Sequence, residues 1–161
     1  MYVLDSNVFI EASRRYYGHD FAPAFWTALE ANAKAGKVLT IDRVELELNK
    51  MKDDLSTWMQ ASFKTFVKPS NDVNVATVYS GMVGWVVAQP QYLPGAKSEF
   101  ATVADGWLIA YAKHHGLTLV THEVLDPHSK KRVPMPNVCQ QFGVDYINTF
   151  ELIRKLNVKF Q

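Results

Sequence analysis

The chain has few of the features that stabilise disulfide-rich or membrane proteins. Its single cysteine, Cys139, excludes an internal disulfide framework and a cysteine-based zinc site, and it suits a reducing compartment. No apolar run approaches the roughly eighteen residues that a membrane span requires. The opening residues also lack a basic region followed by a signal-type apolar stretch. We therefore expect a cytoplasmic protein with no membrane segment.

The chain also lacks a strong charge of either sign and a phosphate-binding loop. Its 17 Lys and Arg residues against 16 Asp and Glu residues give a formal net charge of +1. This balance excludes a chain-wide nucleic-acid signature but allows a local basic groove. Gly81 and Gly84 lie in a helical stretch, where close helix packing explains them, and the histidines show no spacing typical of zinc sites.

The chain does contain an alternation of short apolar runs and helical patterns. With 161 residues, 48% of them hydrophobic and 20% charged, it has the composition of one globular domain, residues 1–161. The expected strands are Tyr2–Leu4, Val38–Ile41, Leu117–Thr121 and Val144–Ile147. The expected helices are one starting near Val8, Pro23–Ala35, one from Val44 continuing to Phe66, Val75–Val86, Phe100–His115, Asn137–Phe142 and Thr149–Leu156. Residues 89–95 and 124–137 are expected to be mostly loop.

This order predicts an α/β fold with a central parallel sheet of about four strands flanked by helices. The stretch between the second and third predicted strands is helical throughout. It should therefore form a helical arm in the middle of the chain.

Four acidic residues lie where such a fold would bring carboxylates to one end of the sheet. Asp5 and Glu123 follow two predicted strands, Glu47 lies in the helix after another, and Asp105 opens a predicted helix. Functional groups collect beyond the carboxyl ends of parallel strands. Clustered carboxylates repel one another unless a cation lies between them, and oxygen ligands favour Mg²⁺ or Mn²⁺. The pattern predicts a divalent metal site.

Two of these acids also have a purely structural interpretation as helix caps. Asp5 stands before Ser6 and Asn7, where Asp often caps a helix. Thr102 to Asp105 fits a capping box, in which Asp105 serves only the helix N-terminus.

The other two acids have an interpretation as solvated charges. Glu47 is positioned like an ordinary exposed helical glutamate, although it borders the apolar stripe and can point inward. Glu45 lies on the other edge of that stripe and is the rival candidate. Glu123 alone is compatible with a loop charge.

The chain resembles the PIN-domain family of metal-dependent nucleases. The matching segments follow the family's order over nearly the whole chain: residues 2–10 (YVLDSNVFI), 44–48 (VELEL), 104–110 (ADGWLIA) and 120–123 (VTHE). The last departs mildly, because many members have Asp where this chain has Glu123. Asp126 is the candidate for a further acidic residue that many members carry nearby.

The resemblance implies a PIN-like three-layer sandwich and a ribonuclease. It implies that Asp5, Glu47, Asp105 and Glu123 bind Mg²⁺ or Mn²⁺ and carry out catalysis. Residues 136–139 look like the tail of a bacterial subgroup found as the toxin of type II toxin–antitoxin pairs. Resemblance to that subgroup implies an RNA substrate, a cognate antitoxin and a homodimer.

Two other functions stay open on the sequence alone. An α/β phosphatase or nucleotide-handling hydrolase would use a similar scaffold, although Asn7 stands where a second Asp would be expected two residues after Asp5. A PIN-like binding module without catalysis would keep the fold alone. Cations that an RNA substrate would need are available: Arg14, Arg15, Arg43, Lys50, Lys52 and residues 130–132.

Overall fold

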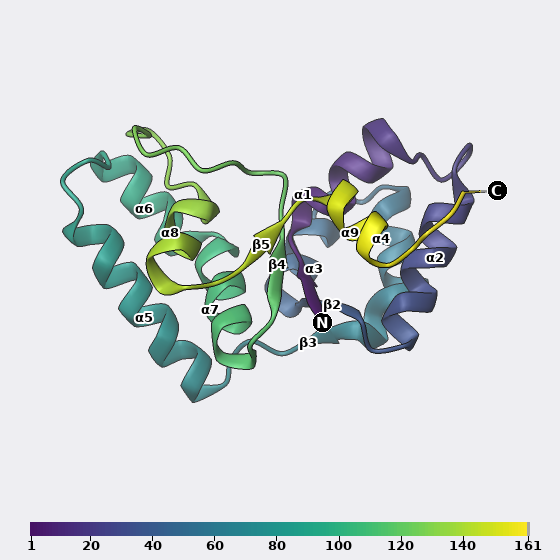
Figure 1. Cartoon of the computed structure of the whole chain (residues 1–161), viewed down its shortest axis with the longest axis horizontal. Helices are drawn as coiled ribbons and strands as arrows, with labels where there is room; N and C mark the ends of the chain where they lie inside the picture. The colour runs from purple at the N-terminus through teal and green to yellow at the C-terminus, as the bar shows by residue number, and fades with distance from the viewer. Residues whose placement is uncertain (161) are drawn as a thin grey trace. The chain divides into compact units, whose positions relative to one another are not determined.

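The computed structural model describes residues 1–160 and shows an α/β fold with a five-stranded sheet. The strands lie in the order β3-β2-β1-β4-β5 (Figure 1). They are β1 Tyr2–Leu4, β2 Val38–Ile41, β3 Val67–Lys68, β4 Thr118–Val120 and β5 Tyr146–Ile147. The helices are α1 Ser6–Glu11, α2 Pro23–Lys34, α3 Asp42–Asn49, α4 Asp54–Trp58, α5 Val73–Ala88, α6 Pro94–Thr102, α7 Asp105–His115, α8 Met135–Phe142 and α9 Thr149–Lys155. Shorter helical segments are the π-helices η1 Ala12–Tyr16 and η2 Met59–Phe63 and the 3-10 helix η3 Lys64–Phe66.

Apolar, buried strands form the centre of the sheet. β1 pairs with β2 in parallel, with Tyr2 opposite Val38 and Val3 opposite Leu39, and β2 pairs with β3 in the same direction. Parallel strands are covered on both faces, so their sequences are continuous apolar runs. The predicted parallel sheet flanked by helices is confirmed.

The sheet has one strand more than the four or so that the sequence predicts. The sequence does not predict β3, because a strand of two residues is too short to show an apolar or alternating pattern. β4 and β5 are shorter than the predicted runs 117–121 and 144–147. In the second run, the backbone N–H of Val144 donates to the carbonyl of Cys139 and so belongs to the turn after α8.

The single helix predicted from Phe100 to His115 is wrong, because two helices cover this stretch. α6 ends at Thr102, Val103 is extended with φ −94° and ψ 171°, and α7 begins at Asp105. α6 itself starts at Pro94, whose fixed φ suits the first helical position. The apolar spacing continues across the break and so conceals it.

The helix predicted from Val44 to Phe66 is also wrong, because α3 ends at Asn49. Lys52 then takes a positive φ of 50°. Asp53 and Ser56 form a capping box that starts α4: the Ser56 N–H donates to Asp53 Oδ1 over 3.0 Å, and the Asp53 N–H donates to Ser56 Oγ over 2.9 Å. Reciprocal caps of this kind begin a new helix.

The remaining helices agree with prediction within a few residues. The predicted helical arm corresponds to α3 to α7, interrupted by β3. α7 ends at Gly116, which adopts a left-handed conformation with φ 66° and ψ 36° as many helix C-caps do. Within residues 1–160, no helix combines the length and the apolar character needed to cross a membrane.

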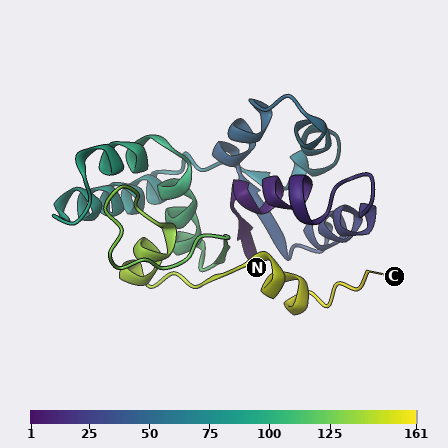
Figure 2. The ribbon, with the colours of Figure 1, turned by 90° about the horizontal axis from the view of Figure 1, so that it is seen from above.

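The chain forms two compact units. The first contains Met1–Pro69, Val120–His122 and the chain from Ile147 onward, and the second contains Ser70–Leu119 and Glu123–Tyr146. In the first unit, the ring of Phe9 packs edge-on against Phe63 with centroids 5.5 Å apart. In the second, α5 runs alongside α7 (Figures 1 and 2). The assignment of residues 1–161 to a single domain stays a prediction.

Candidate active site

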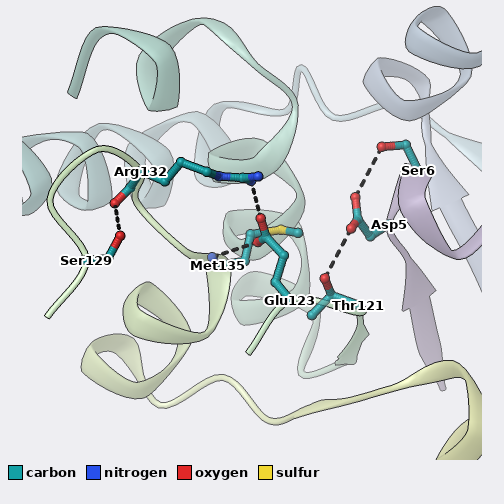
Figure 3. Close-up of polar contacts among 7 residues, drawn as sticks. All are labelled: Asp5, Ser6, Thr121, Glu123, Ser129, Arg132 and Met135. Atoms are coloured by element: carbon teal, nitrogen blue, oxygen red, sulfur yellow. Dashed lines mark hydrogen bonds and ion pairs between the residues drawn. The ribbon is translucent and has the colours of Figure 1, made fainter. Parts of the chain in front are cut away.

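Asp5 is a buried carboxylate at the end of β1. Its backbone N–H donates to the carbonyl of Val120 over 3.0 Å, and only 2% of the residue is exposed. Its Oδ1 accepts from Ser6 Oγ over 3.3 Å, and its Oδ2 accepts from Thr121 Oγ1 over 3.1 Å (Figure 3). Two hydroxyl donors therefore fix the direction of both carboxylate oxygens.

The interpretation of Asp5 as a simple helix cap is wrong. Asp5 occupies the N-cap position of α1, but its side chain accepts no hydrogen bond from the backbone of that helix. Its partners are hydroxyls instead, one of them 116 residues away in the sequence. A third hydroxyl connects the two neighbouring strands: Thr40 Oγ1 in β2 donates to the carbonyl of Leu4 in β1 over 2.7 Å. Asp5 is thus a buried carboxylate directly after β1 whose two oxygens accept from hydroxyl groups.

Glu47 and its rival Glu45 both lie on α3 in the first unit, and both are partly buried. Glu45 Oε1 accepts from Gln60 Nε2 over 2.8 Å, and the same amide group donates to Asn49 Oδ1 over 2.9 Å. These contacts give Glu45 a local structural role between α3 and η2. α3 packs against α1, the helix that follows Asp5. This packing does not distinguish the two glutamates, and the choice of Glu47 stays a prediction.

Asp105 is the first residue of α7 in the second unit, and the predicted capping box around it is wrong. The N-cap of α7 is Ala104, which makes no side-chain cap, and Thr102 belongs to α6. Thr102 Oγ1 donates to the carbonyl of Glu99 over 3.0 Å. A carboxylate in the first turn of a helix is nevertheless favoured by the helix dipole.

Glu123 is held by two donors in the second unit. Its Oε1 forms an ion pair with Arg132 Nη2, and its Oε2 accepts from the backbone N–H of Met135, the first residue of α8, over 2.9 Å (Figure 3). The side chain is mostly buried, so the interpretation as a solvated loop charge is wrong. Arg132 also lines a small pocket with Asp105. One guanidinium group therefore links the surroundings of Asp105 and Glu123.

Asp126 has a local role in the loop after Glu123. It is exposed, and its Oδ1 accepts from the backbone N–H of His128 over 3.1 Å. Its backbone N–H and carbonyl bond to the side-chain amide of Asn137, over 3.0 and 2.8 Å. The Asn137 amide also donates to the Tyr92 hydroxyl over 2.9 Å. These contacts fold the loop back onto α8.

Sequence reasoning misses the groups that hold the carboxylates. Ser6 and Thr121 leave no distinctive signal, although a hydroxyl residue directly after a buried strand is a position at which to look. The sequence offers the basic run 130–132 only as one candidate for contact with substrate phosphate, and it gives no sign that Arg132 pairs with Glu123.

Two other reactive side chains are poor candidates for the chemistry. Burial raises the pKa of the Cys139 thiol to about 12, with a smaller contribution from the charge of Glu123. The thiolate is therefore scarce near neutral pH. Burial lowers the pKa of His122, an effect that the Glu11 charge partly opposes. A ring nitrogen of His122 lies 2.8 Å from Thr149 Oγ1.

The donor chemistry of the four predicted acids fits a hard divalent cation. Carboxylate oxygens are the ligands that Mg²⁺ and Mn²⁺ prefer. Among residues 1–160, no group of three or more His, Cys, Asp or Glu side chains is placed to hold a metal. The four-residue metal site stays a prediction.

Several solved structures share this fold. FitAcB from Neisseria gonorrhoeae aligns with a TM-score of 0.56 and 21% identity over 93% of this chain and 99% of that chain. FitAB bound to an IR36 DNA fragment aligns with a TM-score of 0.52 and 20% identity over 92% of this chain and 94% of that chain. VapBC2 from Rickettsia felis, bound to a DNA fragment from its promoter, aligns with a TM-score of 0.52 and 16% identity over 91% of this chain and 97% of that chain. The PIN-like fold that the sequence resemblance implies is confirmed.

A comparison of the sequence with family models also gives a match over nearly the whole chain. No curated protein matches the chain. The family model described as a domain of unknown function, DUF4411, matches residues 2–160. The chain therefore belongs to the DUF4411 family, with a fold of the PIN type.

Proposed function

We propose that this chain is a metal-dependent endoribonuclease that hydrolyses RNA phosphodiester bonds and acts as the toxin of a type II toxin–antitoxin pair. The observation that carries the proposal is the buried carboxylate of Asp5 at a parallel strand end, oriented by Ser6 and Thr121. Burying a carboxylate is costly, so a fold that orients one without using it as a cap has a use for its charge.

Asp5, Glu47, Asp105 and Glu123 are the residues that would hold Mg²⁺ or Mn²⁺. The bound ion would lower the pKa of a coordinated water and stabilise charge on the phosphate oxygens. The chain's own groups then have distinct tasks. Ser6 and Thr121 fix the direction of the Asp5 carboxylate, and the N–H of Met135 fixes that of Glu123.

Arg132 supplies positive charge beside the carboxylates. Its guanidinium pairs with Glu123 while more than half of its side chain is exposed. A guanidinium presents several N–H donors in one plane and binds phosphate oxygens in pairs, so Arg132 can contact a substrate phosphate without releasing Glu123. It also offsets the repulsion that an acidic pocket exerts on RNA.

The neighbours that share the fold support the proposed antitoxin partner. FitAB and VapBC are toxin–antitoxin systems, and the FitAB and VapBC2 structures contain DNA. We propose that this chain binds a cognate antitoxin. From the sequence alone we also propose that it forms a homodimer and works in the cytoplasm.

The test is cleavage of a total-RNA pool by the purified chain with Mg²⁺, with EDTA, and after single substitutions. Asp5→Asn and Glu47→Gln should each lower the rate more than the 10–100-fold that loss of an outer-shell partner typically causes. Glu45→Gln is the matched control on the same helix and should cleave near the wild-type rate. Cleavage that survives both EDTA and Asp5→Asn would refute the proposal.

Two further measurements separate the alternatives. A panel of small phosphate esters would reveal a phosphatase, which would hydrolyse them faster than RNA. Calorimetric titration with Mn²⁺ would identify a silent module, which would bind no divalent ion. Loss of Mn²⁺ binding in Glu45→Gln but not in Glu47→Gln would exchange the roles of the two glutamates.

A further inference from the structure

We propose that Tyr16, His122 and Phe150 form a stacking site for an unpaired base of the RNA substrate. The inference rests on the proposed ribonuclease function and specifies how substrate is held. The three residues, called here the aromatic site, come from η1, from the residue pair after β4 and from α9. All three belong to the first unit.

The rings of the aromatic site lie close together. The centroids of Tyr16 and Phe150 are 5.2 Å apart with the rings nearly perpendicular. Those of Tyr16 and His122 are 6.1 Å apart, and those of His122 and Phe150 are 6.0 Å apart. The contact between His122 and Thr149 Oγ1 holds the imidazole in place. Segments far apart in the sequence thus build one preformed aromatic surface.

This surface is open to solvent. Tyr16 is 44% exposed and Phe150 is 37% exposed. Single exposed apolar residues are ordinary, whereas here two exposed rings are in contact and the partly buried His122 lies against both. Aromatic rings bind single-stranded nucleic acid because every base has a face that can stack on them.

Cations flank the aromatic site on two of its elements. Arg14 and Arg15 directly precede Tyr16, and both are exposed. On α9, Arg154 follows Phe150 by four residues, which places the two on the same face of the helix, and it is also exposed. Exposed rings with guanidinium groups on the same elements suit a base and its flanking phosphates.

The acidic residues on these elements already have partners. Glu11 Oε2 forms an ion pair with Arg15 at 3.2 Å. Glu151 Oε2 accepts from the backbone N–H of Asn148 over 3.0 Å in the capping box of α9. The Glu11 charge is therefore balanced by Arg15, and the capping bond directs the Glu151 carboxylate to the N-terminus of α9.

The aromatic site also lies next to the candidate active site along the chain. His122 directly follows Thr121, whose hydroxyl donates to Asp5 Oδ2. A base stacked there is held by the residue next to the one that orients the carboxylate. This continuity favours the substrate over a protein partner as the occupant.

The test measures binding of a fluorescent single-stranded RNA to the full chain carrying Asp5→Asn, with EDTA present to prevent cleavage. Phe150→Ala and Tyr16→Leu should each weaken binding about tenfold, a loss within the range measured for single base–aromatic stacks. Leu keeps apolar packing at position 16, so this variant distinguishes lost stacking from lost folding. Phe21→Ala is the matched control, because Phe21 is an exposed aromatic residue, 67% exposed, outside the aromatic site.

An RNA with abasic positions supplies the second arm. Since it offers no base to stack, the aromatic variants should bind it as tightly as the parent does. Equal affinities of the variants and the parent for ordinary RNA would overturn the inference, as would an equal loss on abasic RNA. Unchanged RNA affinity together with conversion of a dimer to a monomer in light scattering would instead identify a self-association surface and also overturn it.

The two proposals can fail separately. A wild-type chain that cleaves no RNA but loses base-dependent binding on Phe150→Ala would refute the nuclease and keep the aromatic site. A wild-type chain that cleaves RNA, together with unaltered RNA binding in both aromatic variants, would keep the nuclease and refute the aromatic site.

Discussion

Thr121→Val removes one hydroxyl from the Asp5 carboxylate with almost no change in side-chain volume. Thr121 is buried, and its Oγ1 donates to Asp5 Oδ2 over 3.1 Å. A hydrogen bond to a charged group contributes about 1.5–3 kcal/mol, so we expect the free energy of unfolding to fall by about 2 kcal/mol. Unfolding entropy of roughly 2.1 cal/mol/K per residue, over 161 residues, converts this into a melting temperature about 6 °C lower.

Thr40→Val is the matched control for this measurement. Thr40 is buried in the same sheet, and its Oγ1 donates to the neutral carbonyl of Leu4 over 2.7 Å. A bond to a neutral acceptor contributes about 1 kcal/mol, half the expected loss at Thr121. Calorimetric or circular-dichroism melts of both variants give the comparison.

A double-mutant cycle then tests the cause of the difference. In the Asp5→Asn background, Thr121→Val should cost only about 1 kcal/mol, because its acceptor is no longer charged. Two results together would refute the view that Thr121 orients an ionised carboxylate. The first is an equal loss of unfolding free energy in Thr121→Val and Thr40→Val, and the second is additivity of the losses in Asp5→Asn and Thr121→Val.

Two further predictions concern the two units separately. Gly106→Ala should destabilise the chain by about 1–3 kcal/mol despite better helix propensity, because the added Cβ would lie 2.9 Å from Tyr79 Cε2 and 3.1 Å from Phe100 Cζ. Burial against Trp26, with ring centroids 3.9 Å apart, lowers the pKa of His19 below its usual 6.5 although nearby carboxylates oppose the effect. The unfolded state then binds more protons below pH 6.5, so the unfolding free energy should fall from pH 7 to pH 5 more steeply in the wild type than in His19→Gln.

Denaturant titrations check both predictions. Nothing lies within 4 Å of a Cβ added to Gly81 or Gly84, so the close helix packing expected at these glycines is wrong. Gly81→Ala therefore controls for helix propensity and should not destabilise the chain. A stable Gly106→Ala would show that Tyr79 moves aside without loss. A steeper pH dependence in His19→Gln than in the wild type would show that Trp26 stabilises the protonated ring instead.

The sequence predicts the parts of the fold that depend on local patterns. The runs 2–4 and 38–41 are apolar and bounded by polar residues, so their strands are evident from the amino-acid pattern alone. The positions of Asp5 and Glu123 just after strands follow from the same patterns. Breaks inside continuous apolar spacing are not evident, because the extended backbone of Val103 and the positive φ of Lys52 leave no Pro or Gly as a marker.

The partners of the carboxylates could not be predicted because they depend on tertiary contacts. Nothing near Asp5 in the sequence indicates that Thr121 will bond to it. The ion pair of Arg132 with Glu123 spans nine residues of irregular loop, for which no periodic pattern exists. Local spacing therefore identifies candidate acids, and only the folded chain identifies which donors orient them.

The bond between Asp5 and Thr121 also has a consequence for protein synthesis. Its two ends are 116 residues apart, so the carboxylate emerges from the ribosome early and its hydroxyl partner emerges late. At translation speeds of about 5–20 residues per second, about 6–23 seconds separate the two events. A nascent or prematurely terminated chain that lacks Thr121 cannot form this bond. Under the proposed ribonuclease function, the order of the strands along the chain would therefore delay activity until most of the polypeptide has been made.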